Sequence, residues 1–548
     1  MSLASTATSS VSPAARALAP VLRGIVEVPE DLTASELTLD SRTVRPGAAF
    51  LACRGRAHHG LEFAQRAAHA GARVILWESA PQVVPPPLDA SIVVREVPDL
   101  HGKLGVIADR FYDAPSAHLV VDAVTGTNGK TTCAWLLAQA LGLLGRRSAY
   151  LGTLGVVSFG AGAAGAAVAG GDADDADDAG DAGDAGAPRP LRVLSHTTPD
   201  VLTLHRLLAQ LLAAGVESVA MEVSSHALDQ ERCAGVRLHA AAFTNLTRDH
   251  LDYHGDMSAY GAAKARLLEW PALAARIVNV DDDFGRALAR RFLAAAEAGG
   301  RPVRLLVTSQ HPAQGFGAAE SVCAADVTAS REGLVLRVQT PRGDARLSSP
   351  LRGRFNADNL LTVLALLLAR GVPLERACDA LSRCQPPPGR MQPEGGGAAP
   401  LALIDYAHTP DALAQALAAA RALCTGHLWC VFGCGGERDR GKRAEMGRIA
   451  AAGADRIIVT DDNPRGEDPA QITTAILQGI TAAGAAARAR VIHDRGAAIR
   501  AALGEAGPPD VVLVAGKGHE EYQLVGDERR EFSDSAAVRA ALASRRAV

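Results

Sequence analysis

Residues 125–132 read TGTNGKTT and have the composition of a loop that binds nucleotide phosphates. They follow an apolar run that predicts a strand over residues 118–124, and they precede a predicted helix over residues 133–144. Glycines let backbone N–H groups approach phosphate oxygens, the start of a helix favours an anion, and Lys130 adds a positive charge. The Thr131 hydroxyl is placed to bind Mg²⁺. We therefore predict contacts to ATP from Gly126, Thr127, Asn128, Gly129, Lys130, Thr131 and Thr132.

A loop of this kind also occurs in GTPases, and residues 252–255 match the DxxG pattern of those proteins. A guanine site would also require an NKxD motif, but the chain contains no Asn-Lys dipeptide. In addition, Val124 stands where the full GxxxxGK[ST] pattern has its first glycine. The sequence therefore argues against a GTPase and favours another nucleotide-dependent protein.

Two further polar residues follow predicted strands and could reach a metal ion bound to the nucleotide. Glu222 ends an apolar run at residues 216–223, and His250 follows a run at residues 241–245. A carboxylate and an imidazole at neighbouring strand ends can both reach Mg²⁺ on a triphosphate. A lone His is more often a hydrogen-bonded surface residue, so the pair is informative because the phosphate loop accompanies it.

Short apolar runs alternate with Ala- and Leu-rich helical stretches along most of the chain, which indicates an α/β fold. Polar, glycine-rich segments recur directly after the predicted strands, in two sets at residues 119–285 and 401–522. Ligands bind at the carboxyl ends of strands in open parallel sheets, because loops diverge there and helix N-termini point inward. We therefore predict two nucleotide-type domains that face one cleft. The predicted strands are residues 118–124, 216–223, 241–245, 276–280, 401–405, 428–432, 456–460 and 510–515.

The 548 residues are too many for one core, and we predict three domains. A small α/β domain occupies residues 1–118, with a loose tail to about residue 20. A central parallel-sheet ATPase domain of the phosphate-loop type occupies residues 119–350, and a C-terminal Rossmann-like domain occupies residues 351–548. Residues 160–190 are almost entirely Ala, Gly and Asp, which cannot build a core, so we predict a disordered insert there.

Composition excludes several classes of protein. The formal net charge is −4, and seven aspartates between residues 172 and 184 dominate it, so the rest of the chain is near neutral and no nucleic-acid partner is expected. No apolar run is long enough to span a membrane, and the first twenty residues lack a secretory signal. The nine cysteines are scattered singly, which favours reduced thiols in a cytoplasmic protein over disulfides or a zinc site.

Four motifs together resemble the Mur ligase family: TGTNGKTT, MEVSSHALDQ, TNLTRDHLDYHG, and a Tyr-Gly-Ala-Ala-Lys segment that ends at Lys264. The resemblance runs in order through residues 39–535. It implies a monomeric ATP-dependent carboxylate–amine ligase of peptidoglycan synthesis. In such an enzyme ATP phosphorylates the γ-carboxylate of the D-Glu in UDP-MurNAc-L-Ala-D-Glu. An incoming amine then attacks this acyl phosphate, and phosphate leaves.

The resemblance also implies catalytic roles for Lys130, Glu222, His250 and Lys264. Thr131 and Glu222 would hold one Mg²⁺, and His250 would hold a second. Lys264 matches the family lysine that carries a CO₂-derived carbamate, which binds Mg²⁺ where an ammonium would repel it. From the residues alone, Lys264 would be interpreted as an exposed helix lysine.

Two groups of residues resemble the family's positions for UDP-MurNAc-L-Ala-D-Glu. The UDP part would contact the leading domain, where this chain departs from the commoner His-Gln-Ala segment. A second group would bind the muramoyl peptide, and within it Arg232 could pair with a carboxylate or diphosphate. The first group is Leu39, Ser41, Arg56, Ala57 and His58, and the second is His196, Thr197, Thr198, Ser224, Gln230 and Arg232.

The C-terminal part would complete the ATP site. The resemblance assigns Asn356 and Asn359 to the adenine and Arg390 to the phosphates, and it places Asp405 in the same cleft. The chain has Gln392 where the family pattern has glutamate, which puts any role of that side chain in doubt.

The segment Asp461-Asp462-Asn463-Pro464-Arg465 indicates which amino acid is added. Meso-diaminopimelate carries a carboxylate and an ammonium at its far end, so its site needs a cation and acceptors. An arginine held in a Pro-containing turn can pair that carboxylate bidentately. We predict that this site comprises Arg438, Asp462, Asn463, Pro464, Arg465, Gly516 and Glu520.

Three alternatives remain to be weighed against this prediction. The first is a lysine-adding Mur ligase, in which the arginine of the Asp-Asn-Pro-Arg segment is typically replaced. The second is a folylpolyglutamate synthase, which shares the phosphate loop but not the match at residues 39–58. The third is a catalytically inactive nucleotide-binding protein, against which the joint presence of Lys130, Glu222, His250, Lys264 and Arg465 argues.

Overall fold

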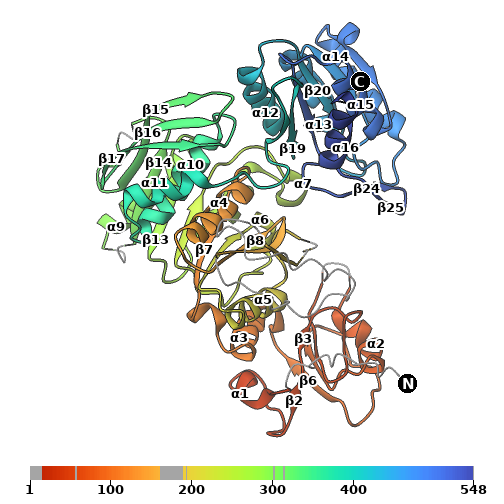
Figure 1. Ribbon diagram of the computed structural model, residues 1–548. Helices are drawn as coiled ribbons and strands as arrows, with labels where there is room; N and C mark the ends of the chain where they lie inside the picture. The colour runs from red at the N-terminus through yellow and green to blue at the C-terminus, as the bar shows by residue number, and fades with distance from the viewer. Residues whose placement is uncertain are drawn as a thin grey trace, which may run out of the picture.

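Three sheets with covering helices follow one another along the chain. The computed structural model describes residues 15–55, 58–160, 189–192, 194, 196–299, 303–312 and 315–546. The sheets contain four, eleven and six strands, from the red N-terminal end to the blue C-terminal end of Figure 1. This architecture confirms the predicted α/β fold with a parallel central sheet.

The central sheet positions the phosphate loop. Its seven inner strands, from β8 to β15 in spatial order, run parallel, and antiparallel strands flank them on both sides. Six of them, from β8 to β14, are buried on both faces, which is why they read as continuous apolar runs, whereas β15 is partly exposed. In spatial order the strands are β10 (Arg189–Arg192), β9 (Gly155–Phe159), β8 (Ser148–Gly152), β11 (Ser218–Glu222), β7 (Val120–Thr125), β12 (Ala240–Phe243), β13 (Ala275–Asn279), β14 (Arg304–Ser309), β15 (Glu320–Ala329), β16 (Leu334–Thr340) and β17 (Gly343–Ser349).

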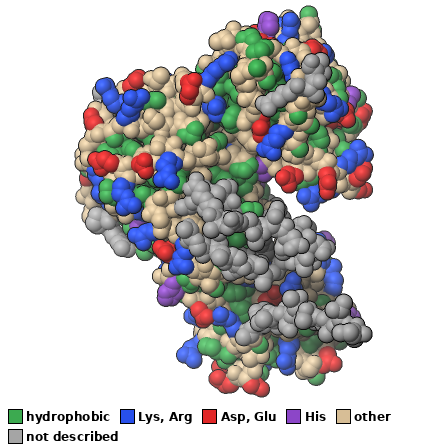
Figure 2. All heavy atoms as spheres, in the orientation of Figure 1, with side chains coloured by type: hydrophobic (Ala, Val, Ile, Leu, Met, Phe, Trp, Pro, Cys, Tyr) green, Lys and Arg blue, Asp and Glu red, His purple; other side chains and the backbone are tan. Residues whose placement is uncertain are grey.

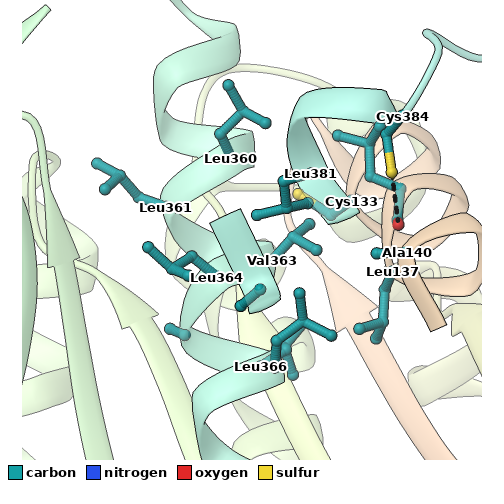
Figure 3. Packing of buried hydrophobic residues seen from close by; sticks show 14 of the residues in the cluster. Cys133, Leu137, Ala140, Leu360, Leu361, Val363, Leu364, Leu366, Leu381 and Cys384 are labelled. Carbon is teal, nitrogen blue, oxygen red and sulfur yellow. Dashed lines mark hydrogen bonds between the residues drawn. The ribbon is translucent and has the colours of Figure 1, made fainter. Parts of the chain in front are cut away.

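Helices cover both faces of this sheet. One face carries α4 (Lys130–Leu143), α10 (Asn356–Ala369) and α11 (Leu374–Arg383), whose apolar side chains form one buried cluster that includes Leu137, Leu364 and Leu381 (Figure 3). The other face carries α5 (Val201–Ala213), α6 (Ser225–Asp229), α8 (Met257–Leu268) and α9 (Asp283–Glu297). Short α7 (Leu251–His254) precedes α8 at the carboxyl edge of the sheet.

Helices α10 and α11 do not match the predicted domain boundary at residue 350. They lie in the segment assigned to the C-terminal domain, yet they pack in the core of the central sheet. Their apolar faces complement the sheet and α4, and a local sequence pattern carries no information on which sheet a helix covers. We therefore propose that the boundary between these two domains lies between α11 and β18, after residue 383.

The six-stranded sheet positions the C-terminal site segments. Strand β18 is antiparallel to β19, and the other neighbours are parallel. Helices α12 (Pro410–Leu423), α13 (Gly441–Gly453) and α14 (Pro469–Ala482) pack on one face, and α15 (Arg495–Glu505) and α16 (Asp534–Arg546) on the other. In spatial order the strands are β18 (Gln392–Gly395), β19 (Leu401–Asp405), β23 (Val511–Ala515), β20 (Leu428–Phe432), β21 (Arg456–Val459) and β22 (Ala489–Val491), with the hairpin β24 (Tyr522–Val525) and β25 (Glu528–Glu531) beside them.

The leading domain is built on four parallel strands. They are β3 (Leu37–Thr38), β4 (Ala49–Ala52), β5 (Val74–Glu78) and β6 (Val93–Val97), with α1 (Leu18–Leu22), α2 (Ala64–His69), η1 (Gly60–Phe63) and α3 (Leu100–Phe111) around them. The prediction of a loose tail to residue 20 is wrong for residues 16–20. Strand β1 (Arg16–Ala17) pairs with β2 (Thr33–Ala34), and Leu18 is buried against α3.

Most of the predicted acidic insert lies outside the described residues. At its C-terminal end, residues 189–190 belong to β10 and pair with β9. Among the described residues, no helix is both long and apolar enough to cross a membrane. On the face drawn in Figure 2, acidic and basic side chains are intermixed outside the grey atoms.

Candidate active site

The phosphate loop joins β7 to α4 and needs glycine at two positions. Gly126 and Gly129 have φ angles of 148° and 86°. A Cβ at Gly126 would lie 1.9 Å from Thr244 Oγ1, and one at Gly129 would lie 2.4 Å from Asn359 Oδ1. Both backbone conformation and space therefore exclude larger residues there. The loop is held from β12, because Asn128 N donates to Asn245 Oδ1 at 2.9 Å.

Lys130 begins α4 and folds back over the loop. Its Nζ donates to the carbonyl oxygens of Gly126 and Thr127, both at 2.9 Å. Burial lowers its pKa, and the carboxylates of Glu222 and Asp249 oppose that shift. The structure thus brings a cation to the point where the backbone N–H groups of the loop start a helix.

Glu222 lies at the end of β11 and contacts the start of α4. Thr131 Oγ1 donates to Glu222 Oε2 at 2.9 Å, and Thr153 N donates to Oε1 at 2.9 Å. Tyr150 also donates to Oε1, and burial next to this carboxylate raises the Tyr150 pKa well above its ordinary value. Within the described chain Glu222 receives only hydroxyl and amide donors and forms no salt bridge. A buried anion without a protein cation bonded to it, together with a hydroxyl, fits Mg²⁺, which prefers oxygen ligands.

Lys264 on α8 is 1% exposed, so it is not the solvated lysine that its residue type alone suggests. Its Nζ donates to Gly126 O at 2.7 Å and lies 4.4 Å from the centre of the Tyr260 ring. Burial, and then the nearby charge of Lys130, lower its pKa well below the ordinary value for lysine. The amine is therefore poised to be neutral beside the phosphate loop.

His250 precedes α7 with a φ of 54°, in the left-handed region that non-glycine residues rarely adopt. Its Nε2 lies 3.4 Å from Asp249 Oδ2, and burial lowers the His250 pKa, which favours the neutral imidazole that binds metals. Burial alone would raise the pKa of Asp249, but the charges of His250, His408 and Lys130 lower it. Among the described residues no group of three His, Cys, Asp or Glu side chains converges on one point. The predicted metal set therefore also needs the Thr131 hydroxyl and Lys264.

The C-terminal domain contacts the phosphate loop through two polar pairs. Arg390 Nη2 donates to Thr131 Oγ1 at 3.2 Å, and Asn128 Nδ2 donates to Asp411 Oδ2 at 2.9 Å. The Arg390 guanidinium also lies 4.6 Å from the centre of the Tyr406 ring. The predicted arginine therefore meets the loop although 259 residues separate it from Thr131.

The remaining predicted ATP residues lie around this junction. Asn359 Nδ2 donates to Asn356 Oδ1 at 2.7 Å in the first turn of α10, next to Gly129. Asp405 ends β19, accepts from Met391 N at 2.8 Å, and has its pKa raised to about 6 by burial. Gln392 Oε1 accepts from Gly389 N at 2.9 Å, so this side chain closes the turn that carries Arg390.

Residues predicted to bind the muramoyl peptide lie together beside Glu222. Thr198 Oγ1 donates to Glu222 O at 3.0 Å and accepts from Ser224 N at 3.2 Å. Arg232 Nη1 donates to Thr198 O at 3.0 Å, and its Nε donates to Gln230 Oε1 at 3.0 Å. Two further residues belong to this predicted group. The Thr197 hydroxyl lies 3.1 Å from that of Thr153, and His196 is exposed.

The residues predicted to bind UDP lie in the leading domain. Ser41 Oγ accepts from Arg66 Nε at 3.0 Å, and exposed His58 lies 3.2 Å from Glu62. Leu39 is half-buried. Arg56 and Ala57 lie outside the described residues. None of the described members of this group has a hydrogen bond or ion pair with the phosphate loop or Glu222.

The predicted amino-acid site lies at the carboxyl edge of the six-stranded sheet. Asn463 Nδ2 donates to Glu520 Oε2 at 2.9 Å, which joins the segment 462–465 to the segment 516–520. A Cβ on Gly516 would lie 2.6 Å from Asp462 Oδ2, so glycine is required for this approach. Arg465, with a φ of 53°, donates from Nη1 to Gly436 O at 2.9 Å in the loop that carries exposed Arg438. Pro464 precedes Arg465 in the same turn.

Three family profiles match the chain along most of its length. They are the Mur ligase family catalytic domain at residues 33–112, the Mur ligase middle domain at residues 124–367, and the Mur ligase glutamate ligase domain at residues 389–518. The chain belongs to the Mur ligase family.

Three relatives of this Mur ligase share one name. A UDP-N-acetylmuramoyl-L-alanyl-D-glutamate–2,6-diaminopimelate ligase from Xanthomonas campestris pv. campestris is 47% identical over 522 residues, which are 95% of this chain and 96% of that protein. A ligase of the same name from Alkalilimnicola ehrlichii is 44% identical over 94% of this chain and 95% of that protein. Another from Pseudomonas aeruginosa is 43% identical over 94% and 96%.

Solved structures agree on the fold of this Mur ligase. A UDP-N-acetylmuramoyl-L-alanyl-D-glutamate–2,6-diaminopimelate ligase has a TM-score of 0.64 at 31% identity and covers 97% of this chain and 99% of its own. A MurF from Acinetobacter baumannii has a TM-score of 0.62 at 18% identity over 97% and 100%, which shows the fold alone. A folylpolyglutamate synthase from Mycobacterium tuberculosis likewise shares only the fold, with a TM-score of 0.56 at 15% identity over 76% and 92%.

Sequence reasoning missed several residues of this Mur ligase's site. Tyr150 and Thr153 bond to Glu222, Arg66 bonds to Ser41, and Lys517 bonds to Asn463 and Glu520. The sequence could have indicated Lys517, because this residue lies between the predicted site residues Gly516 and Glu520. It carries no such indication of the others, because their partners lie far away in the sequence.

Proposed function

We propose that this Mur ligase adds meso-diaminopimelate to the D-Glu γ-carboxylate of UDP-MurNAc-L-Ala-D-Glu, with ATP as co-substrate, in peptidoglycan synthesis. Relatives named for that activity are 43–47% identical over nearly the whole chain, which supports the proposal. One observation of the geometry carries the choice of amino acid. The segment with Arg465 lies directly against the segment with Glu520, through the 2.9 Å bond between Asn463 and Glu520. A cation and a carboxylate acceptor on adjoining segments match the carboxylate and ammonium at the far end of diaminopimelate.

In the proposed reaction a γ-carboxylate oxygen of D-Glu attacks the γ-phosphorus of ATP, and ADP leaves. The amine of diaminopimelate then attacks the acyl carbon, gives up a proton, and phosphate leaves. The backbone of the phosphate loop and Lys130 bind the phosphates, and Arg390 approaches them from the C-terminal domain. Asn356 and Asn359, which bond to each other beside the phosphate loop, are assigned to the adenine, and Asp405 holds the turn after Arg390 through Met391. These groups neutralise and orient the anions that converge in the reaction.

Mg²⁺ is assigned to Thr131 and Glu222 at one position and to His250 at a second. When bound, it neutralises negative charge on the phosphates. Lys264 is assigned the carbamate role, in which its neutral amine attacks CO₂, loses a proton and becomes an anionic oxygen ligand. The lowered pKa of Lys264 supports this assignment, because only the unprotonated amine can react with CO₂.

The UDP-linked dipeptide is assigned to two surfaces. Leu39, Ser41, Arg56, Ala57 and His58 would bind the UDP end, and the muramoyl peptide would contact His196, Thr197, Thr198, Ser224, Gln230 and Arg232. The cluster of Thr198, Ser224 and Arg232 next to Glu222 supports the second assignment, because it is adjacent to the proposed metal. Arg438, Asp462, Asn463, Pro464, Arg465, Gly516 and Glu520 are assigned to diaminopimelate. We further propose a monomer that works in the cytoplasm, where ATP is supplied.

The test is phosphate release from ATP with purified protein, Mg²⁺ and UDP-MurNAc-L-Ala-D-Glu, with meso-diaminopimelate or L-lysine offered separately. We expect fast release with diaminopimelate and slow release with lysine, because lysine lacks the distal carboxylate that Arg465 would pair. Faster release with lysine would support the lysine-adding alternative. Release with neither amino acid would support the inactive nucleotide-binding alternative.

A further inference from the structure

Lys517 is fully buried at the edge of the six-stranded sheet, in the loop that follows β23. Its Nζ lies 3.0 Å from Asn463 Oδ1, 3.0 Å from Glu520 Oε2 and 3.9 Å from Asp462 Oδ1. All three partners were predicted to contact the added amino acid, whereas Lys517 itself cannot reach solvent. Lys517 therefore touches every polar side chain on the acceptor side of that site without lining it.

The two carboxylate oxygens of Glu520 have different surroundings. Oε2 accepts from both Lys517 Nζ at 3.0 Å and Asn463 Nδ2 at 2.9 Å. Oε1 accepts from no group in the described part of the chain, and the Glu520 side chain is 17% exposed. A carboxylate clamped through one oxygen presents the other in a fixed direction, which is the preorganisation that a charged ligand requires.

The Asn463 side-chain amide, unlike Glu520, is hydrogen-bonded through both its oxygen and its nitrogen. Its Oδ1 accepts from Lys517 Nζ and from Leu524 N, both at 3.0 Å, while its Nδ2 donates to Glu520. Leu524 O in turn accepts from Arg465 N at 3.0 Å. Lys517 thus ties the acceptor Glu520 to the backbone that carries the cation Arg465, and Asn463 acts as the connector between them.

The charges of this cluster leave room for a cationic group. Two carboxylates, Asp462 and Glu520, surround one lysine, so one negative charge remains without a partner inside the cluster. A purely structural pair looks different. Arg495 and Asp534 are both fully buried, and the two oxygens of Asp534 accept from Nε and Nη2 of Arg495, so the two charges of that pair neutralise each other.

We propose that Lys517 is a positioning residue that holds Glu520 so that Oε1 accepts the distal ammonium of the amino acid being added. This inference rests on the proposed function, because it names how one end of that substrate is recognised. Lys517 neutralises one of the two carboxylates, and the ligand ammonium neutralises the other. Arg465 independently pairs the distal carboxylate.

The test compares meso-diaminopimelate with 2-aminopimelate, which keeps the distal carboxylate but has hydrogen in place of the distal amine. We expect wild-type protein to prefer diaminopimelate by ~10–100-fold in kcat/KM, as for the loss of a hydrogen bond between charged groups. In Lys517→Met this preference should fall to within about threefold of unity, through a higher KM for diaminopimelate. KM for ATP should stay within about threefold of wild type, because Lys517 does not contact the phosphate loop.

Two further variants keep the test decisive if Lys517→Met folds poorly. Glu520→Gln should lose the same preference, because a neutral amide attracts an ammonium far less than a carboxylate does. Arg495→Met removes an equally buried cation from α15 in the same domain, and it should lower the melting temperature while leaving the preference at the wild-type value, because Arg495 bonds Asp534 and not Glu520. Melting curves with and without ATP check that each variant is folded.

An unchanged preference in Lys517→Met or Glu520→Gln would overturn the proposal, as would equal use of both amino acids by the wild-type protein. Equal losses for both amino acids in Lys517→Met would make Lys517 merely structural. Failure of wild-type protein to use either one would instead overturn the proposed function. The two failures are therefore distinguishable.

Discussion

Lys264 and Lys517 are both buried at the ligand edge of a parallel sheet, but their surroundings are opposite. Lys264 in the central domain meets one carbonyl oxygen and the positive charge of Lys130, and its pKa is lowered. Lys517 in the C-terminal domain meets an amide oxygen and two carboxylates. The same residue type at equal depth thus has two different electrostatic surroundings in one chain.

This difference in surroundings corresponds to two proposed roles, covalent modification for Lys264 and recognition of the amino acid for Lys517. A buried amine without a bonded counter-ion loses its proton more easily, so the surroundings of Lys264 favour covalent modification of the nitrogen. An amine that contacts carboxylates, as Lys517 does, can instead hold them in place. The chain contains only five lysines among its 56 basic residues, so lysine at these two buried positions is not a consequence of composition.

The largest effect should come from removing the Lys264 amine. Lys264→Ala is expected to lower kcat by ~1,000-fold or more, because it removes the amine proposed to carry the carbamate that would bind Mg²⁺ beside the phosphates. Turnover is measured by phosphate release. Added bicarbonate should not restore it, because no amine is left to carry a carbamate. Near-normal activity would eliminate the carbamate role.

The second-largest effect should be a difference in stability between variants of the two lysines. Lys517→Met leaves the buried Asp462 and the partly buried Glu520 without the lysine between them and should destabilise the protein by ~3–5 kcal/mol. Lys264→Met should cost much less. Because the Lys264 pKa is lowered, the unfolded chain binds a proton that the folded chain lacks, and this cost grows as pH falls below the ordinary lysine pKa. Methionine removes that cost.

Melting curves at pH 7 in metal-free buffer measure this contrast. We expect Lys517→Met to melt at least ~5 °C below Lys264→Met, since about 1 kcal/mol corresponds to 2–4 °C in a domain of this size. Equal melting temperatures would mean that the two surroundings do not differ energetically, and the comparison would fail.

A substitution at Arg465 should separate the proposed amino-acid site at the edge of the C-terminal sheet from the ATP site at the edge of the central sheet. Arg465→Ala is expected to raise KM for diaminopimelate by ~10–100-fold, because the proposed bidentate contact with the distal carboxylate would be lost, and to change KM for ATP little. Steady-state kinetics with each substrate varied in turn provide the measurement. Equal increases in both KM values would make Arg465 a structural residue rather than a ligand of the amino acid.

The smallest effect is expected at Gln392, where the chain departs from the family pattern. This residue begins β18, directly after the turn that carries Arg390. Its Oε1 accepts from Gly389 N, and a glutamate oxygen can accept the same bond. Gln392→Glu should therefore keep kcat/KM for ATP within ~3-fold of wild type. A larger change would show that this side chain influences Arg390 directly.

Elements defined by local patterns were predictable. The eight predicted strands match β7, β11, β12, β13, β19, β20, β21 and β23 to within two residues at each end, and the Leu-rich segment after Phe355 is α10. Short continuous apolar runs, each followed by a polar segment, contain this information. The packing of α10 on the central sheet was not predictable, because an apolar helix face fits many partners.

The sequence by itself determined the phosphate loop, the positions of Glu222 and His250 after strands, and the family. These depend on residue types at short, fixed spacings. Only the tertiary structure decided that Lys264 is buried, that Arg390 meets Thr131 and that Lys517 lies between Asn463 and Glu520. Burial and long-range contacts set the charge and orientation of each group, and they depend on segments that are distant in the chain.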